Sequence, residues 1–172
     1  MLVHFIRHCP TVSDPSQHAE SWVLEPDVAH HELSIRVFVQ ALSFDLVVTS
    51  PEVKARETAK RLFGEDQSVE VDERFAELQR GRFLKDYETQ VTATFNAPEL
   101  SINGWESADS CQQRGREALR ILAQKKLDRI CVCGHGLQGA LLRSFSLKQA
   151  HASLKEWAAI NMPDHMWPAP QG

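Results

Sequence analysis

The chain has 172 residues, of which 42% are hydrophobic and 24% are charged, and its formal net charge is −4. This length predicts a single domain spanning residues 1–172, because domains usually hold roughly 100–200 residues. The acidic balance excludes a basic surface for nucleic-acid backbones, since such surfaces need an excess of positive charge. Any site for an anion must therefore be a local pocket.

Neither a membrane span nor a leader peptide is indicated. The longest apolar stretch without charged residues, 130–142, is interrupted by glycine, histidine and glutamine, and it is shorter than the roughly 20 residues of a spanning helix. The first seven residues lack the pattern of a signal peptide. The four cysteines show no CxxC motif, which is typical of reduced thiols. We therefore expect a cytoplasmic protein that binds neither membranes nor nucleic acids.

Two short apolar runs bounded by polar residues predict buried strands in the first third of the chain. These strands cover residues 2–6 and 46–49. Between them lie a loop rich in proline, serine and aspartate at 9–18 and a predicted helix over 33–43. The helix is indicated by apolar residues at helical spacing, namely Leu33, Val37, Ala41 and Leu42.

A second helix follows the strand at 46–49. Ser50 is predicted as its N-cap and Pro51 as its first residue, because these residue types favour those positions. The helix should run to Phe63, where Gly64 can end it. Residues 69–71 then predict a third, shorter strand.

The second half of the chain repeats the alternation of helix and strand. Residues 107–126 predict a helix with one apolar face, and its basic residues are interpreted as solvated: Arg114, Arg116, Arg120 and Lys125. The elements predicted after it are a strand at 130–133, a helix to about 145, a helix at 149–159 and an irregular tail from Met162. Alternating strands and helices predict an α/β fold around a mostly parallel sheet.

In such sheets ligands bind beyond the carboxyl ends of the strands, where helix N-termini also point. This rule brings together Arg7 with His8, the segment 50–56 and His135. Histidines beside cationic side chains suit a phosphate dianion, which a neutral imidazole can attack to form a phosphoenzyme. A carboxylic acid such as Glu77 can then give a proton to the leaving alcohol.

Four motifs occur in an order that resembles the histidine phosphatase superfamily, the phosphoglycerate mutase-like proteins. The segment 5–11, with its Arg-His pair, resembles that family's RHG box, and 50–59 resembles its second box. Residues 72–77, followed by Gly81 and Phe83, resemble the segment that holds the family's proton donor. Gly134-His135-Gly136 matches the segment of its second histidine.

The resemblance implies a three-layer α/β/α sandwich and a metal-independent phosphomonoesterase with no cofactor. It implies that His8 becomes phosphorylated while Arg7 binds the phosphate, and that His135 hydrogen-bonds the transferring phosphoryl group. The implied catalytic residues are His8, Glu77 and His135, and the implied substrate-binding residues are Arg7, Lys54 and Thr11. The implied substrate is a small phosphorylated molecule such as a sugar phosphate or α-ribazole phosphate, with phosphohistidine proteins as an alternative.

Three positions depart from the family pattern. Cys9 stands where the family has glycine, and Asp14 stands where its first loop usually has asparagine. The second arginine of the family corresponds to Lys54, which keeps the charge but loses the planar fork of a guanidinium. Arg56 is the alternative cation, but two residues on a helix differ by about 200° of rotation, and we favour Lys54.

Several side chains allow a second interpretation. Glu73 and Glu88 are alternatives to Glu77 as the acid. Cys131, Cys133 and His135 alternate along a strand and could suggest a zinc site, although small core residues explain the pattern equally and a fourth ligand is missing. The thiol of Cys9, in a cationic loop, could have a lowered pKa and oxidise readily.

Two further functions remain as alternatives to a phosphatase. The short interval between Glu77 and Gly104 and the chain end at Gly172 favour hydrolysis over a mutase-type phosphotransfer, because related mutases shield the phosphoenzyme from water. A regulatory module that binds phosphate without turnover is supported by the departures at Cys9, Asp14 and Lys54. The tryptophans near the end of the chain could cover this chain's core or a partner's, which would give a homodimer.

Overall fold

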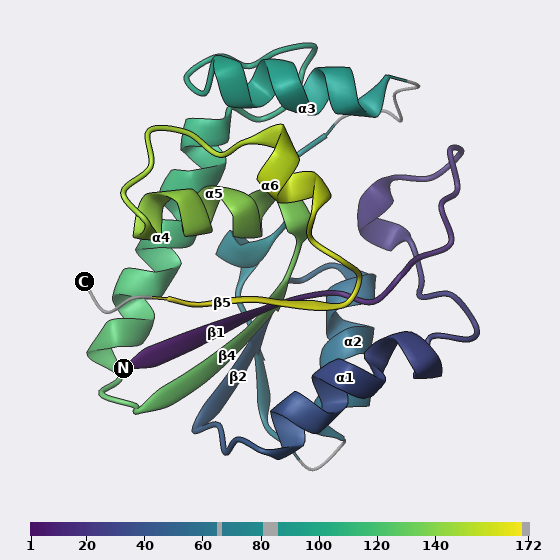
Figure 1. Cartoon of the computed structure of the whole chain (residues 1–172), viewed down its shortest axis with the longest axis vertical. Helices are drawn as coiled ribbons and strands as arrows, with labels where there is room; N and C mark the ends of the chain where they lie inside the picture. Colours follow the sequence, from purple (N-terminus) through teal and green to yellow (C-terminus); the bar gives the residue numbers. More distant parts are fainter. Residues whose placement is uncertain (65–66, 81–85, 170–172) are drawn as a thin grey trace.

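In the computed structural model, which describes residues 1–64, 67–80 and 86–169, five strands form one sheet (Figure 1). The strands are β1 Leu2–Arg7, β2 Leu46–Thr49, β3 Val69–Val71, β4 Arg129–Gly134 and β5 Asp164–Ala169. They lie in the order β3-β2-β4-β1-β5. The first four are parallel to one another, and β5 pairs with β1 in the antiparallel direction. The prediction of a mostly parallel sheet is confirmed.

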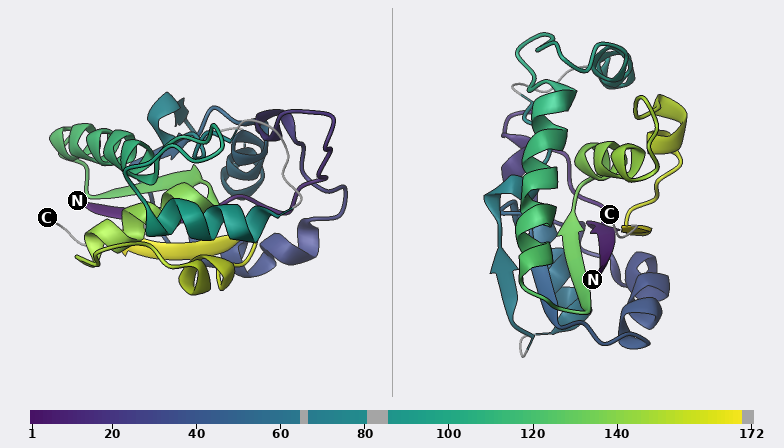
Figure 2. Two further views of the ribbon diagram at one scale, coloured as in Figure 1. Left: turned by 90° about the horizontal axis from the view of Figure 1, so that it is seen from above. Right: turned by 90° about the vertical axis from the view of Figure 1, so that its left-hand side faces the viewer.

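Helices cover both faces of this sheet (Figure 2). Two helices pack on one face, α1 Ala29–Gln40 and α2 Val53–Phe63, and two on the other, α4 Ala108–Gln124 and α5 Gly136–Ser146. The helices α3 Tyr87–Asn96 and α6 Leu154–Ala158 contact each other, and α6 also contacts α5. Short 3₁₀ turns at Ala19–Ser21 (η1) and Glu73–Phe75 (η2) complete the described elements. The arrangement confirms the predicted α/β/α sandwich.

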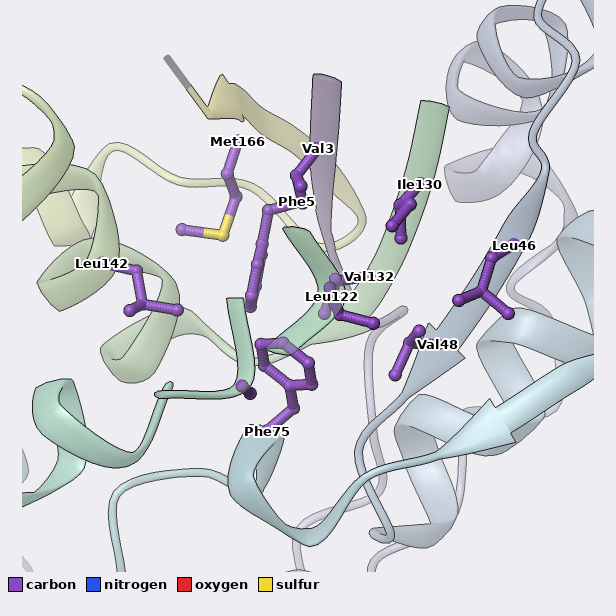
Figure 3. Packing of buried hydrophobic residues seen from close by; sticks show 11 residues of the cluster. Val3, Phe5, Leu46, Val48, Phe75, Leu122, Ile130, Val132, Leu142 and Met166 are labelled. Atoms are coloured by element: carbon purple, nitrogen blue, oxygen red, sulfur yellow. The ribbon is translucent and has the colours of Figure 1, made fainter. Parts of the chain in front are cut away.

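Each central strand sends alternate side chains to the two faces, because the side-chain period of a strand is two. One set packs under α4 and α5 and forms a cluster centred on Phe5 and Phe75 (Figure 3). The opposite set packs against α1 and α2, and Cys131 and Cys133 belong to it. The interpretation of these two cysteines as core residues is confirmed.

The first helix begins and ends earlier than predicted, at 29–40 instead of 33–43. The predicted apolar positions Leu33 and Val37 are each 61% exposed, whereas Ile35 and Val39 face the sheet. The spacing rule found a helix, but it selected the wrong face because both faces of this helix carry apolar residues. A surface position is common for single apolar residues.

Residues Asp164–Ala169 form a strand, whereas the prolines predicted an irregular segment here. Residues of β5 pair with Val3–Arg7 of β1, whose outer edge would otherwise leave backbone N–H and C=O groups unpaired. Pro168 is tolerated in β5 because edge strands can lack a ladder donor. The sequence also missed α3, and α6 covers only Leu154–Ala158 of the predicted 149–159.

The described helices include none with both the length and the apolar character that crossing a bilayer demands.

A histidine pair, with His4 buried and His165 half-buried, joins β1 to β5. His4 Nδ1 lies 3.0 Å from His165 Nε2, and the two rings stack on each other beside Phe38. Burial, followed by the charges of His165 and Arg129, lowers the pKa of His4 to about 4. Burial also lowers the pKa of His165, with Asp164 opposing the shift. The pair is therefore held in its neutral form.

This pair should make stability decline with acidity. Histidines with a lowered folded pKa bind fewer protons than the unfolded chain, so stability falls as pH drops from about 6.5 towards about 4. Between pH 7 and pH 5 the free energy of unfolding should fall for both proteins. We expect the fall to be smaller in His4→Gln than in the wild type, by on the order of 1 kcal/mol. Urea unfolding at both pH values measures this difference, with His151→Gln, at an exposed position, as the control. Equal pH dependence of His4→Gln and the wild type would contradict the prediction.

Candidate active site

The carboxyl ends of β1, β2 and β4 bring three distant segments together. His8 N donates to Gly134 O at 3.0 Å, and Ser50 N donates to Cys133 O at 3.0 Å. These backbone bonds place His8, Ser50 and His135 side by side at one edge of the sheet. The segments that follow β1, β2 and β4 therefore meet, as predicted from the sequence.

His8 is buried with its ring close to that of His135, at 5.2 Å between ring centroids. Its Nδ1 lies 2.7 Å from Cys9 O, and since a carbonyl can only accept, Nδ1 carries the proton. Burial and the neighbouring His135 lower the pKa of His8 well below its usual value. The ring is therefore neutral, and the lone pair lies on Nε2.

His135 is the N-cap residue of α5 and is fully buried. Its Nε2 lies 2.7 Å from Ser50 Oγ and 3.4 Å from Glu52 Oε1. Burial lowers its pKa to about 3, with the charge of Glu77 opposing the shift. Among the described residues, its Nδ1 has no hydrogen-bond partner, which is unusual for a buried polar atom.

The contact with His135 explains why the predicted start of α2 was wrong. The helix begins at Val53 with Glu52 as its N-cap residue, whereas Ser50 and Pro51 were predicted as cap and first residue. The hydroxyl of Ser50 accepts from Glu52 N at 3.2 Å and also contacts the imidazole of His135. Ser50 therefore belongs to the site and not to the helix. The end of α2 at Gly64 is as predicted.

Glu77 is buried against the first turn of α5. Its carboxylate accepts from Leu137 N at 3.1 Å, from Gln138 N at 2.9 Å and from Leu78 N at 2.9 Å. The unpaired N–H groups and the dipole of a helix N-terminus favour a negative group at this place. The alternative acids Glu73 and Glu88 are exposed, so the geometry favours Glu77.

Arg7 packs its guanidinium group over Gly136. A Cβ atom at Gly136 would lie 2.9 Å from Arg7 Cζ, a distance shorter than real contacts allow. Arg7 Nη1 donates to Ile160 O at 2.7 Å, while its Nε is buried without a partner among the described residues. The absence of a side chain at Gly136 thus lets the guanidinium group of Arg7 lie at the N-terminus of α5, next to Glu77.

Lys54 lies at the site and is only 2% exposed. Its Nζ donates to Ala19 O at 2.6 Å and forms an ion pair with Glu52. The second oxygen of Glu52 accepts from Glu77 N at 2.7 Å. Glu52 is a site residue that the sequence analysis missed, because neighbours two apart on a helix do not face each other. They meet here since Glu52 precedes the helix in an extended conformation.

The remaining predicted positions fall in different surroundings. Arg56 lines a groove of about 450 Å³ between α2 and β3, which leaves Lys54 as the cation of this motif at the site. Thr11 is half-buried and forms a backbone bridge with Leu24, and its hydroxyl remains a proposed ligand. The carboxylate of Asp14 accepts from Ser16 within its own loop. Gly81 and Phe83 lie outside the described residues.

The hypothesis of a reactive Cys9 is wrong. Its side chain is fully buried, and burial raises the pKa of the thiol to about 11. The backbone N–H of Cys9 donates to Thr58 Oγ at 3.0 Å. A side chain at this position is therefore accommodated in the interior next to α2, where the family has glycine.

Two arginines near Glu77 were not anticipated. Arg114, which was predicted to be solvated, donates to the carbonyl oxygens of Arg74, Ala76 and Glu77 and pairs with Glu106. Arg80 Nη1 donates to Tyr87 Oη at 2.6 Å. Neither contact could be predicted from the sequence, because each involves loop residues that follow no periodic pattern.

The model of the histidine phosphatase superfamily (branch 1) matches residues 3–166. Solved structures with the same fold include Bacillus stearothermophilus YhfR, at 18% identity and a TM-score of 0.73 over 97% of this chain and 88% of that one. A mycobacterial glucosyl-3-phosphoglycerate phosphatase matches at 19% identity and a TM-score of 0.71, covering 94% and 84%. The α-ribazole phosphatase of Shigella flexneri matches at 18% and 0.66, covering 92% and 84%. The comparison with curated proteins gave no match.

The contact between Gly136 and Arg7 gives a prediction that separates binding from stability. We expect Gly136→Ala to displace the guanidinium and to weaken the binding of inorganic phosphate about tenfold or more, because a charge-assisted hydrogen bond contributes roughly 1.5–3 kcal/mol. Thermal unfolding should change little, since alanine favours a helix over glycine by up to about 1 kcal/mol. Isothermal titration with phosphate measures the loss.

Gly115→Ala is the matched control, because its added methyl group meets Leu142 between α4 and α5 and not a residue of the site. Unchanged phosphate affinity in Gly136→Ala would show that Arg7 does not bind the anion.

Proposed function

Because the chain belongs to the histidine phosphatase superfamily, we propose that it is a metal-independent phosphomonoesterase that works through a phosphohistidine at His8. The observation that carries this proposal is the hydrogen bond from His8 Nδ1 to Cys9 O, which leaves a lone pair on Nε2. A neutral, buried imidazole is an effective nucleophile only when its reacting nitrogen is unprotonated. The lowered pKa of His8 supports this state at neutral pH.

In the first step, Nε2 of His8 forms a bond to phosphorus while the bond from phosphorus to the ester oxygen breaks. Arg7 binds the phosphoryl oxygens, and this electrostatic stabilisation acts on the charge of the transition state. His135, at the N-terminus of α5, hydrogen-bonds the transferring group. The orphaned Nδ1 of His135 and Nε of Arg7 support their roles as ligand-binding atoms.

Glu77 acts as the general acid for the leaving oxygen. The approach of a phosphate dianion favours the protonated carboxylic acid, because like charges oppose each other. The acid gives its proton to the departing alcohol. In the second step, the carboxylate takes a proton from water as the water oxygen attacks phosphorus. The bond between nitrogen and phosphorus then breaks, which releases phosphate and restores neutral His8.

The proposed substrate is a small phosphorylated molecule of the sugar phosphate or α-ribazole phosphate type. Two of the similar structures are named as a glucosyl-3-phosphoglycerate phosphatase and an α-ribazole phosphatase, but at 18–19% identity they show the fold alone. Support comes from the site itself, whose charged groups are local and buried within a chain of net charge −4. A cytoplasmic location and a homodimer stay predictions.

Substitution of the nucleophile tests the proposal directly. His8→Ala should reduce the hydrolysis of p-nitrophenyl phosphate by a factor of about 10⁴ or more, because the covalent route is lost. Wild-type protein incubated with ³²P-labelled substrate and quenched in alkali should retain label that is released by acid, and the variant should not. The exposed substitution His151→Ala controls for loss of a histidine.

Unchanged turnover in His8→Ala would refute the mechanism. Tight phosphate binding without hydrolysis of any substrate in a broad panel would instead favour the regulatory module, for which the neutralisation of Lys54 by Glu52 is the supporting observation.

The role of Glu77 predicts a dependence on the leaving group. Glu77→Gln cannot donate a carboxylic proton, so alkyl phosphates should slow by about 10²–10⁴-fold, the usual contribution of general acid catalysis. Dinitrophenyl phosphate, whose leaving group needs no proton, should slow by much less. Rates measured over a series of leaving groups give the slope. Glu73→Gln is the control, and an equal loss for every leaving group would indicate a structural role for Glu77.

A further inference from the structure

Lys54 is poorly placed to bind a substrate because its charge is already neutralised inside the protein. Its Nζ donates to Ala19 O and pairs with Glu52, so two of its three N–H donors are used. Both partners of the ion pair are buried. Drawing the ammonium group away would leave the Glu52 carboxylate as an uncompensated buried charge, which is costly.

Arg80 is a second guanidinium within reach of the same groups. Burial is the largest cause of the lowered pKa values of Arg7 and His135, and the charge of Arg80 adds to both shifts. Burial opposes the raised pKa of Arg80 itself, which Tyr87, Glu77 and Glu52 raise. Arg80 also follows the buried Glu77 by only three residues in the same loop, which keeps the two side chains in one region of the molecule. Among the described cations proposed for the site, Lys54 carries an ammonium group, whereas Arg7 and Arg80 carry planar guanidinium groups.

Tyr87 holds Arg80 in position. The guanidinium carbon lies 5.2 Å from the centroid of the Tyr87 ring, and Nη1 donates to Tyr87 Oη. Burial raises the pKa of Tyr87 to about 12, so the phenol is neutral. The hydrogen bond to Tyr87 uses one of the five N–H donors of the guanidinium. Arg80 is thus fixed by an aromatic neighbour that does not cancel its charge.

Arg80 also lines an open groove of about 640 Å³, together with His18 and Glu20. Glu20 belongs to the same 3₁₀ turn as Ala19, the residue whose carbonyl holds Lys54. The groove therefore lies beside the buried site, and Arg80 is common to both. A phosphate ester whose organic part occupies the groove would have its phosphoryl group next to Arg80.

We propose that Arg80 binds the phosphoryl oxygens of the substrate and supplies the second guanidinium fork that Lys54 cannot. This inference rests on the proposed function and adds a substrate-binding residue to it. A fork of parallel N–H donors matches two oxygens of a phosphate dianion, whereas an ammonium group acts as a point charge. Among the described charges, Arg80 also offsets the carboxylates of Glu52 and Glu77, so that the site can accept a dianion.

Direct binding of inorganic phosphate and orthovanadate tests this assignment without any need for turnover. Arg80→Gln should weaken both ligands about 10- to 100-fold, the range expected for a lost charge-assisted contact. Arg80→Lys should recover part of the affinity, and Tyr87→Phe, which keeps the charge but removes its acceptor, should weaken binding about three- to tenfold. Arg56→Gln, on the groove between α2 and β3, should bind as the wild type does.

The competing assignment, that Lys54 binds the phosphoryl oxygens, is tested with the double variant Glu52→Gln, Lys54→Met. This variant removes both partners of the ion pair, so neither is left as an unpaired buried charge. We expect its phosphate affinity to fall by a smaller factor than that of Arg80→Gln, because the Lys54–Glu52 ion pair carries no net charge. Normal binding by Arg80→Gln, or loss of binding in the double variant alone, would overturn the inference. Thermal unfolding of each variant excludes a general loss of structure.

The outcomes also separate this inference from the proposed function. If His8 forms no phosphoenzyme but Arg80→Gln still weakens phosphate binding, the mechanism is wrong and the assignment of Arg80 stands. If phosphoenzyme forms normally and the KM for p-nitrophenyl phosphate is unchanged in Arg80→Gln, the mechanism stands and Arg80 has no role in binding.

Discussion

The carboxylate of Glu77 bound to the N-terminus of α5 is the contact on which the arrangement of the site depends. It fastens the segment after β3 to the helix that begins beside His135. The N–H groups in the first turn of a helix have no partners within their own helix, so a buried carboxylate satisfies them and is satisfied in return. Glu52, which accepts from the backbone N–H of Glu77, extends this connection to the start of α2. The three segments are therefore held by mutual hydrogen bonds as well as by the sheet.

Charge balance distinguishes this site from a simple cluster of cations. A buried ion pair between Lys54 and Glu52 gives local rigidity, but it leaves less positive charge for an anion. The two histidines are neutral because burial and neighbouring cations oppose protonation. Arginine is therefore the group that can face a dianion here, since its charge persists when it is partly desolvated.

Sequence patterns predicted the parts of the molecule that depend on local chemistry. The strands that end at Arg7, Thr49 and Gly134 are short apolar runs, and the rule for parallel sheets was sufficient to bring His8 and His135 together. The motif order singled out Glu77, which the structure places against the N-terminus of α5 and which we propose as the acid.

What the sequence did not predict depends on contacts between distant segments. No periodic signal marks the pairing of β5 with β1, the contact of Ser50 with His135, or the hydrogen bonds from Arg114 to three carbonyl groups within residues 74–77. The exposed Leu33 and Val37 show that spacing identifies a helix more reliably than it identifies the buried face.

The hydrogen bond from Arg7 to Ile160 O joins residues that are 153 positions apart in the chain. During synthesis the guanidinium is made near the beginning, and its carbonyl anchor leaves the ribosome much later. Translation products that stop before residue 160 would carry Arg7 without the carbonyl acceptor that orients its guanidinium group. The orientation of this guanidinium therefore waits until the segment between α6 and β5 has been made and has docked beside β1.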